Sequence, residues 1–344
     1  MPAPTAAKVG VPRHDMSVIL VTGSYDHEIR FWEAWSGICS RTITRTGESG
    51  QVNRLAISPD KRLLAAAIHK KVNIYDITSA SSEPLITFEG HTKNVTSVSF
   101  HSEGKWLVTG SEDGTIKIWD LRFKWPFTPN LRQWQSGYHP LDCQESLRFN
   151  AIHTVNDVCV HPNQGELISC DQAGSIKQWD LSENVCSHEL TPAGKTPIRS
   201  VSLALDGSCL VAGNNKGHCY VWKVNDASTG LPRFQAVTTF HAHNKYLTRC
   251  LLSPDAKCLA TCSADTTVAI WSISPNYEFK QERVLIGHQR WVWDCAFSAD
   301  SAYLVTASSD HTARLWEMAS GETVRQYNGH HKAAVCCALH DGAG

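Results

Sequence analysis

The sequence predicts an all-β fold, a seven-bladed β-propeller closed by a C-terminal strand that joins three N-terminal strands. The first observation behind this prediction is an apolar-x-apolar-aromatic ending that recurs along the chain. Its aromatic residues are Trp32, Tyr75, Trp119, Trp179, Trp222, Trp271 and Trp316, at successive separations of 43, 44, 60, 43, 49 and 45 residues. A period near 44 residues is typical of blades built from four short strands.

Each repeat contains the same order of short segments in which apolar and polar residues alternate. In one repeat these segments are 95–100, 105–111 and 115–121, and they end at Gly, Asp, Ser or Pro. Two-residue alternation bounded by such residues predicts antiparallel strands and not helices. With the Trp-Asp pairs at 119–120 and 179–180, the chain resembles the WD-repeat family.

A second spacing joins a histidine, an aspartate and the tryptophan of a repeat. In three repeats the aspartate lies 22 residues and the tryptophan 28 residues after the histidine; the sets are His91, Asp113 and Trp119, then His243, Asp265 and Trp271, then His288, Asp310 and Trp316. A histidine that donates to an aspartate satisfies polar groups between neighbouring strands, at on the order of 1.5–3 kcal/mol per charge-assisted bond. We interpret each set as a structural latch. The alternative, a catalytic His-Asp pair, is disfavoured because the pair repeats at one spacing.

Three repeats lack both latch partners. The aspartate position holds His69, Ala173 or Lys216, and the histidine position holds Gly47, Ala151 or Gly194. A buried aspartate without its histidine would remain unsatisfied at a cost of roughly 1–3 kcal/mol, so the partners are expected to disappear together. The paired absence therefore favours the structural interpretation.

The two ends of the chain hold complementary parts of one repeat. Residues 17–32 match the second and third strands of another repeat, and residues 329–341 match its first strand. We therefore expect a flexible tail at 1–16 and one propeller domain at 17–341, with His330, Asp26 and Trp32 as a fourth latch. Closure of this kind removes exposed sheet edges.

Composition excludes several classes of partner. The chain has 32 Lys and Arg against 33 Asp and Glu, a formal charge of −1, which supplies no basic field for nucleic acid or anionic lipid. No apolar run approaches the roughly 20 residues of a membrane-spanning helix, and no signal peptide is recognisable. The 13 cysteines include no CxxC pair, so we expect reduced thiols and neither a disulfide framework nor a zinc site. These features predict a cytoplasmic protein without direct membrane insertion.

No motif indicates an enzyme. The chain contains no HExxH, GxSxG or GxGxxG run, and the phosphate-loop lookalike at 193–196 lacks the preceding glycine, with Glu189 in its place. The histidines do not show metal-ligand spacing. We therefore expect no catalytic residues, no metal, no cofactor and no small-molecule substrate.

One sector of the predicted ring favours binding of another protein. The residues that flank the first apolar residue of each first strand are expected to face the mouth of the central channel; they are Gln51 and Asn53, Asn94 and Thr96, Thr154 and Asn156, Pro197 and Arg199, Tyr246 and Thr248, Trp291 and Trp293, and Ala333 and Val335. The sector with Trp291, Trp293 and Tyr246 lies beside the amides of Gln51 and Asn53, and tryptophan and tyrosine are typical interface anchors. The alternative is that each indole packs between blades.

Several stretches resemble one branch of the WD-repeat family, the small G-protein-beta-subunit-like (GβL) subunits of the TOR kinase complexes. They are 25–42, 49–53, 161–181, 258–271, 290–316 and 329–339. The resemblance implies a non-catalytic subunit that docks on the C-lobe of the TOR kinase domain and stabilises its active form. It further implies that Gln51, Asn53 and Trp291 face the kinase, and that the protein reaches endomembranes only peripherally, through the kinase complex.

An insertion departs from the family pattern. The 60-residue separation between Trp119 and Trp179 exceeds the period by roughly 16 residues, and 123–142 shows no strand alternation. We expect a loop of about 123–148 on the face opposite the tryptophan sector.

Two other functions compete with the TOR interpretation. WDLR at 119–122 resembles the WDxR docking pattern of substrate receptors for cullin-type ubiquitin ligases, although the repeat itself easily produces it. A G-protein β subunit would bring an N-terminal coiled coil, and no heptads precede residue 17.

Overall fold

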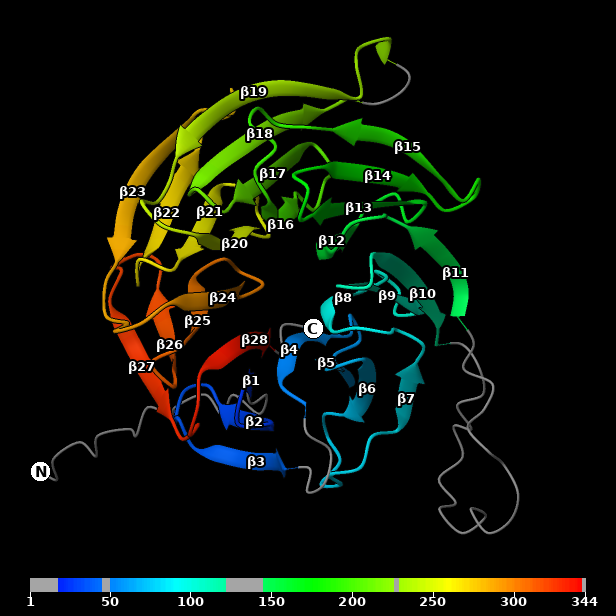
Figure 1. Cartoon of the computed structure of the whole chain (residues 1–344). Coiled ribbons are helices and arrows are strands. Elements are labelled where there is room, and N and C mark those ends of the chain that lie inside the picture. Colours follow the sequence, from blue (N-terminus) through cyan, green and yellow to red (C-terminus); the bar gives the residue numbers. More distant parts are fainter. Residues whose placement is uncertain (1–17, 45–49, 122–144, 226–228, 342–344) are drawn as a thin grey trace, which may run out of the picture.

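The computed structural model describes residues 18–44, 50–121, 145–225 and 229–341. These residues form 28 strands in seven four-stranded antiparallel sheets, which are arranged as blades around a central channel (Figure 1). Among the described residues, no helix is long and apolar enough to cross a lipid bilayer. The predicted all-β, seven-bladed fold is confirmed.

The blades follow one another in chain order except where the ring closes. Blade 1 consists of β28 (Ala334–His340), β1 (Ile19–Ser24), β2 (Glu28–Glu33) and β3 (Cys39–Thr44). Blade 2 consists of β4 (Val52–Ile57), β5 (Leu63–Ile68), β6 (Lys71–Asp76) and β7 (Ile86–Glu89), and blade 3 of β8 (Val95–Phe100), β9 (Trp106–Ser111), β10 (Thr115–Asp120) and β11 (Glu145–Asn150). Blade 4 consists of β12 (Val155–Val160), β13 (Glu166–Asp171), β14 (Ile176–Asp180) and β15 (Val185–Leu190), and blade 5 of β16 (Ile198–Leu203), β17 (Cys209–Asn214), β18 (His218–Val224) and β19 (Phe234–His241). Blade 6 consists of β20 (Leu247–Leu252), β21 (Cys258–Ser263), β22 (Val268–Ile273) and β23 (Phe279–Leu285), and blade 7 of β24 (Val292–Phe297), β25 (Tyr303–Ser308), β26 (Thr312–Glu317) and β27 (Thr323–Asn328).

The ring closes in blade 1, where the C-terminal strand completes the N-terminal sheet. β28 pairs antiparallel with β1 (Figure 1). In this register Leu339 lies opposite Leu20. Beyond the sheet, the backbone carbonyl of Asp341 accepts a bond from Lys61 of blade 2, while its carboxylate accepts one from the backbone N–H of Ala299 in blade 7. The C-terminal strand therefore connects three consecutive blades.

Hydrophobic packing between neighbouring blades forms the core. Seven clusters of described residues occupy the seven blade interfaces. The interface of blades 2 and 3, for example, buries Phe88 beside Trp119, with their ring centroids 5.1 Å apart. The alternation of apolar residues along each strand places one set of side chains in each of the two adjacent interfaces.

Four blades carry a complete latch of histidine, aspartate, threonine and tryptophan. In blade 3, His91 Nδ1 lies 3.0 Å from Asp113 and His91 Nε2 lies 2.7 Å from the hydroxyl of Thr109, which also accepts the indole N–H of Trp119 at 2.9 Å. A neutral imidazole that donates through Nδ1 and accepts at Nε2 satisfies every group. The same arrangement joins His243, Asp265, Thr261 and Trp271; His288, Asp310, Thr306 and Trp316; and His330, Asp26, Thr22 and Trp32.

The blades without a latch show what the latch does to the backbone. In latched blade 3, the N–H that follows the histidine, on Thr92, donates to Asp113. Blades 4 and 5 have no such aspartate, and the equivalent residues Ile152 and Lys195 adopt positive φ values of 74° and 44°. This conformation is costly for a β-branched residue such as Ile152. Gly47, the equivalent of the latch histidine in blade 2, falls outside the described residues.

The insertion lies in blade 3, in the connection between β10 and β11. The predicted loop core, 123–142, falls outside the described residues. β11 begins at Glu145 and pairs with β10, so the last four residues of the expected 123–148 loop belong to a strand. The predicted boundary is too late because the insertion separates β11 from the residues that set the register of the repeat.

A candidate protein-binding mouth

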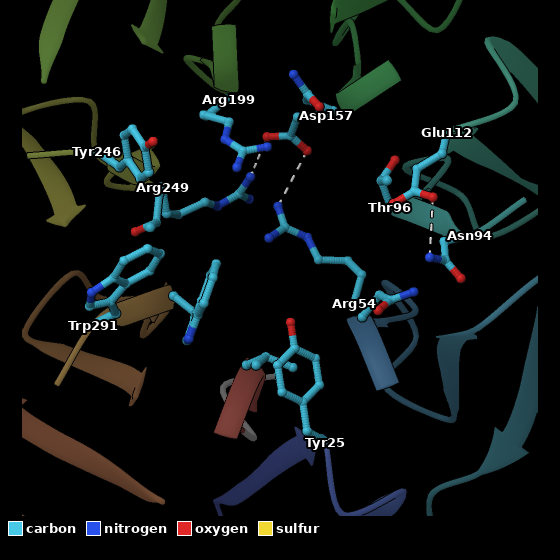
Figure 2. A pocket seen from close by; sticks show the side chains of 15 residues that line it. Tyr25, Arg54, Asn94, Thr96, Glu112, Asp157, Arg199, Tyr246, Arg249 and Trp291 are labelled. Atoms are coloured by element: carbon cyan, nitrogen blue, oxygen red, sulfur yellow. Dashed lines mark hydrogen bonds and ion pairs between the residues drawn. The ribbon is translucent and has the colours of Figure 1, made fainter. Parts of the chain in front are cut away.

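The central channel opens into a cavity of about 190 Å³ on the face that carries the latch turns (Figure 2). Its lining comes from every blade and is mostly polar. It includes four of the five residues predicted to bind a partner, Asn53, Tyr246, Trp291 and Trp293. We call this cavity and its rim the mouth.

β-Bulges direct side chains into the mouth. In β4 the residues Val52 and Arg54 pair with consecutive residues of β5, so Asn53 between them has no partner in the register. A bulge leaves one residue unpaired and redirects its side chain. The same bulge occurs in the innermost strands of blades 3 to 7, and the unpaired residues, Asn53, Thr96, Asn156, Arg199, Thr248 and Trp293, all line the mouth.

Four of these six residues bind the next blade. The Asn53 amide donates to the carbonyl of Val95 at 2.9 Å, and the Thr96 hydroxyl donates to that of Val155 at 2.7 Å. Asn156 and Thr248 make equivalent bonds to Ile198 and Val292. Asn53 is thus a structural residue of the ring as well as a mouth residue. Arg199 and Trp293 make no bond of this kind.

The aromatic sector occupies the part of the mouth formed by blades 6 and 7. Trp291 is 38% exposed and Tyr246 is 46% exposed, and their rings meet edge to face at 5.8 Å. Trp293 is partly buried beneath them, with its ring 5.3 Å from that of Trp291 and its indole N–H donated to Ser309 at 2.6 Å. Trp293 therefore packs into the ring, whereas Trp291 and Tyr246 present their faces outward.

Gln51 lies apart from the aromatic sector. It lines a second depression of about 510 Å³ together with His27, His69 and Lys332. Tyr25 and Asn94 line both hollows, so the two are adjacent on this face. The spacing argument correctly places Gln51 on this face but not beside Trp291.

A network of two partly buried arginines and two buried aspartates supports the floor of the mouth. Arg54 bonds Asp157 at 3.3 Å and Asp294 at 3.1 Å, and Arg249 bonds Asp157 at 2.5 Å and lies 3.4 Å from Asp294. Two arginines and two aspartates make the network neutral. Burial by itself lowers the pKa of Arg249, but the two carboxylates raise it above its ordinary value. Burial raises the pKa of Asp157, but the two guanidinium groups and the hydroxyls of Ser97 and Ser200 lower it below its ordinary value.

Sequence reasoning missed this network and Tyr25. The four charged residues each follow a bulged residue by one position, and comparing this position across the repeats would have found them. Tyr25 occupies the place that Glu112 holds in blade 3, one residue before the latch aspartate. Within a single repeat none of these positions shows a pattern that indicates a function, because the residues come together only when the ring closes.

The described residues offer one group with metal-ligand geometry, Asp26, Glu28 and His330. Both ring nitrogens of His330 are engaged by Asp26 and Thr22, and Glu28 binds Arg30 at 2.7 Å. This group is therefore satisfied by the latch of blade 1. The twelve described cysteines are free thiols, and burial raises the pKa of Cys250 and Cys209 to about 12, far from a reactive thiolate.

Comparisons with known proteins show one family model and several relatives that match most of the chain. Residues 51–342 match the family model described as the IFT122 first beta-propeller. The chain is 58% identical to the target of rapamycin complex subunit wat1 of Schizosaccharomyces pombe over 96% of this chain and 97% of that protein. It is 55% identical to the target of rapamycin complex subunit LST8 of Saccharomyces cerevisiae (95% and 100% covered) and 42% identical to LST8 of Mus musculus (94% and 95% covered).

Proposed function

The chain belongs to the LST8 family of WD-repeat β-propellers, and we propose that it is a non-catalytic subunit of target of rapamycin (TOR) kinase complexes. The identity to proteins named as TOR complex subunits spans nearly the full length of both chains. In this role the chain acts in the cytoplasm and reaches endomembranes only through its complex. A fluorescently tagged chain that remains in a membrane fraction after the kinase is depleted would contradict that location.

The mouth is the proposed docking surface for the C-lobe of the TOR kinase domain. The observation that carries this proposal is the pair of outward-facing rings of Trp291 and Tyr246, 38% and 46% exposed, on a frame of closed sheets. Exposed aromatic rings with rigid support are the residues that typically contribute most to an interface. Gln51, Asn53 and Trp293 extend the same surface toward the second depression and the floor of the mouth. Because the ring is closed and each blade is braced by its neighbours, a docked C-lobe is held against a surface that does not deform, which stabilises its active form.

Substitution of Trp291 by glutamate tests the proposal. The variant is expected to lose recovery of TOR kinase in affinity purification followed by mass spectrometry, since a charge would replace the exposed ring at the interface. Its thermal unfolding temperature should remain close to that of the parent, because the side chain is already in contact with water.

Trp35→Glu is the matched control. Trp35 is 48% exposed and packs edge to face on Tyr303 at 5.0 Å, but it follows β2 at the end of that strand away from the latch turn. This variant should recover the kinase normally. Normal recovery with Trp291→Glu, or equal loss with both variants, would reject the mouth as the docking surface.

The ubiquitin-ligase alternative gains no support from the geometry of 119–122. Trp119 is 2% exposed and Asp120 9% exposed, and the indole N–H of Trp119 is bonded to Thr109 within the latch. Arg122 lies outside the described residues. The same purification distinguishes the two functions, since ligase adaptors recovered without the kinase would favour the alternative.

A further inference from the structure

Arg199 departs from the pattern of the other bulged residues in the mouth. Asn53, Thr96, Asn156 and Thr248 each donate a hydrogen bond to the next innermost strand. Arg199, at the same position of blade 5, is partly buried and makes no hydrogen bond or ion pair with any described residue. Figure 2 shows its side chain pointing into the cavity. The fold thus directs a cation into the mouth without an ion pair to any described residue.

The two described carboxylates that line the mouth with Arg199, those of Asp157 and Glu112, are bonded to other groups. Asp157 accepts bonds from Arg54, Ser97 and the backbone of Val158 on one oxygen, and from Arg249, Ser200 and the backbone of Val201 on the other. A carboxylate has about four acceptor sites, so Asp157 has no capacity for a further donor. Glu112 accepts the amide of Asn94 at 3.1 Å. Neither carboxylate accepts a bond from Arg199, so its five N–H donors have no hydrogen-bond partner among the described residues.

The size of the cavity limits which groups can enter it and accept hydrogen bonds from Arg199. At about 190 Å³, it is smaller than the roughly 300–1,000 Å³ of pockets that enclose small-molecule ligands. One side chain of a docked protein fits this volume. A carboxylate is the group that matches a guanidinium in charge and in bidentate geometry.

We propose that the mouth receives an acidic side chain of the docked partner, which Arg199 binds as its counter-ion while Trp291 and Tyr246 contact the surrounding surface. This inference rests on the proposed docking of TOR kinase and adds the chemistry that the docked segment must carry, an aspartate or glutamate directed into the channel. The neutral network of Arg54, Asp157, Arg249 and Asp294 forms the floor of the cavity, and the end of that acidic side chain would lie next to it.

The test measures the dissociation constant of full-length TOR kinase with the full chain and with Arg199→Lys, Arg199→Gln and Arg199→Glu. Hydrogen bonds to charged groups contribute enough that Arg199→Gln should weaken binding by about ten- to hundredfold. Arg199→Lys, which keeps the charge but not the planar fork, should lose less, and Arg199→Glu should lose the most. Unfolding temperatures verify that each variant is folded. Arg325→Gln, an exposed arginine on the outer strand β27, is the matched control and should bind as the parent does.

The outcomes separate this inference from the function on which it rests. If the parent chain binds the kinase and Trp291→Glu abolishes binding, but Arg199→Gln binds within twofold of the parent, the acidic-side-chain inference is overturned and the docking proposal stands. Equal or tighter binding by Arg199→Glu would overturn it as well, since the cavity would then prefer a basic group. If the parent chain itself fails to bind, the docking proposal fails.

Discussion

Replacing Asp113 by alanine should lower the free energy of unfolding by about 2–3 kcal/mol. Its carboxylate accepts bonds from the ring of His91, the backbone of Thr92, and the backbone and hydroxyl of Thr115. Burial alone raises the pKa of Asp113, but these bonds lower it from 3.8 to about 2. At about 1.36 kcal/mol for each pH unit, that difference corresponds to roughly 2.5 kcal/mol of stabilisation of the ionised form. The side chain is only 7% exposed, so solvent screening reduces the figure little.

Differential scanning calorimetry measures this loss. For a chain of this size the unfolding entropy of about 2.1 cal/mol/K per residue converts 2.5 kcal/mol into a fall of roughly 4 °C in unfolding temperature. Asp206→Ala is the matched control, because Asp206 also accepts a backbone N–H and a hydroxyl within a turn, both from Ser208, but has no histidine partner. A loss with Asp113→Ala no larger than that of the control would show that the latch contributes nothing beyond ordinary turn bonds.

Four further outcomes follow from the same contacts. Asp157→Asn should destabilise the ring by about 3–5 kcal/mol, because it leaves two partly buried guanidinium groups with one carboxylate; unchanged denaturant unfolding would contradict the network. Deleting 329–344 removes the inner strand of blade 1 and should abolish cooperative melting, so a soluble truncation that melts in one transition would refute closure by that strand. The difference in stability between the parent and Asp113→Ala should be complete above the unfolded pKa of 3.8 and should lose most of its value as pH falls to about 2, since the folded pKa is the lower one; an undiminished difference at pH 2 in urea titrations would exclude the carboxylate as its source. Asp310→Ala should weaken kinase binding more than Asp113→Ala does at equal loss of stability, as measured by interferometry, and equal weakening would argue against bracing of the Trp291 loop.

The fold was largely predictable because each repeat contains residues that indicate the positions of its own strands. The spacing of histidine, aspartate and tryptophan fixes where the second and third strands meet, and the matching of 17–32 and 329–341 to parts of one repeat fixes the closing blade. The innermost strands of the four latched blades were also predictable, since each begins four residues after its latch histidine. The start of β11 was not, because the insertion separates it from the residues that set the register.

The mouth was predictable only in part. Reading across the first strands located Asn53, Trp291 and Trp293, because the bulge repeats at the same position in all seven blades, Val335 of β28 being the unpaired residue in blade 1. The ion pairs of Arg54 with Asp157 and Asp294 join residues 103 and 240 positions apart. No local pattern indicates such a contact. The sequence alone does not distinguish Trp291 from Trp293, because one directly precedes β24 and the other lies within it. Their difference in solvent exposure arises only when the strands pack.

The latch of blade 7 connects the architecture of the ring to its docking surface. His288 binds Asp310 at 2.8 Å, and the backbone of Gln289 donates to the same carboxylate. Two residues later, the carbonyl of Trp291 accepts the backbone N–H of Ser309 at 2.8 Å. The loop that carries the most exposed indole of the mouth is therefore fixed at both ends before any partner arrives, and a preorganised loop loses less conformational entropy on binding. Arg199 follows an unlatched loop in which Lys195 has a positive φ, so the aromatic part of the mouth is braced by a latch and the charged part is not.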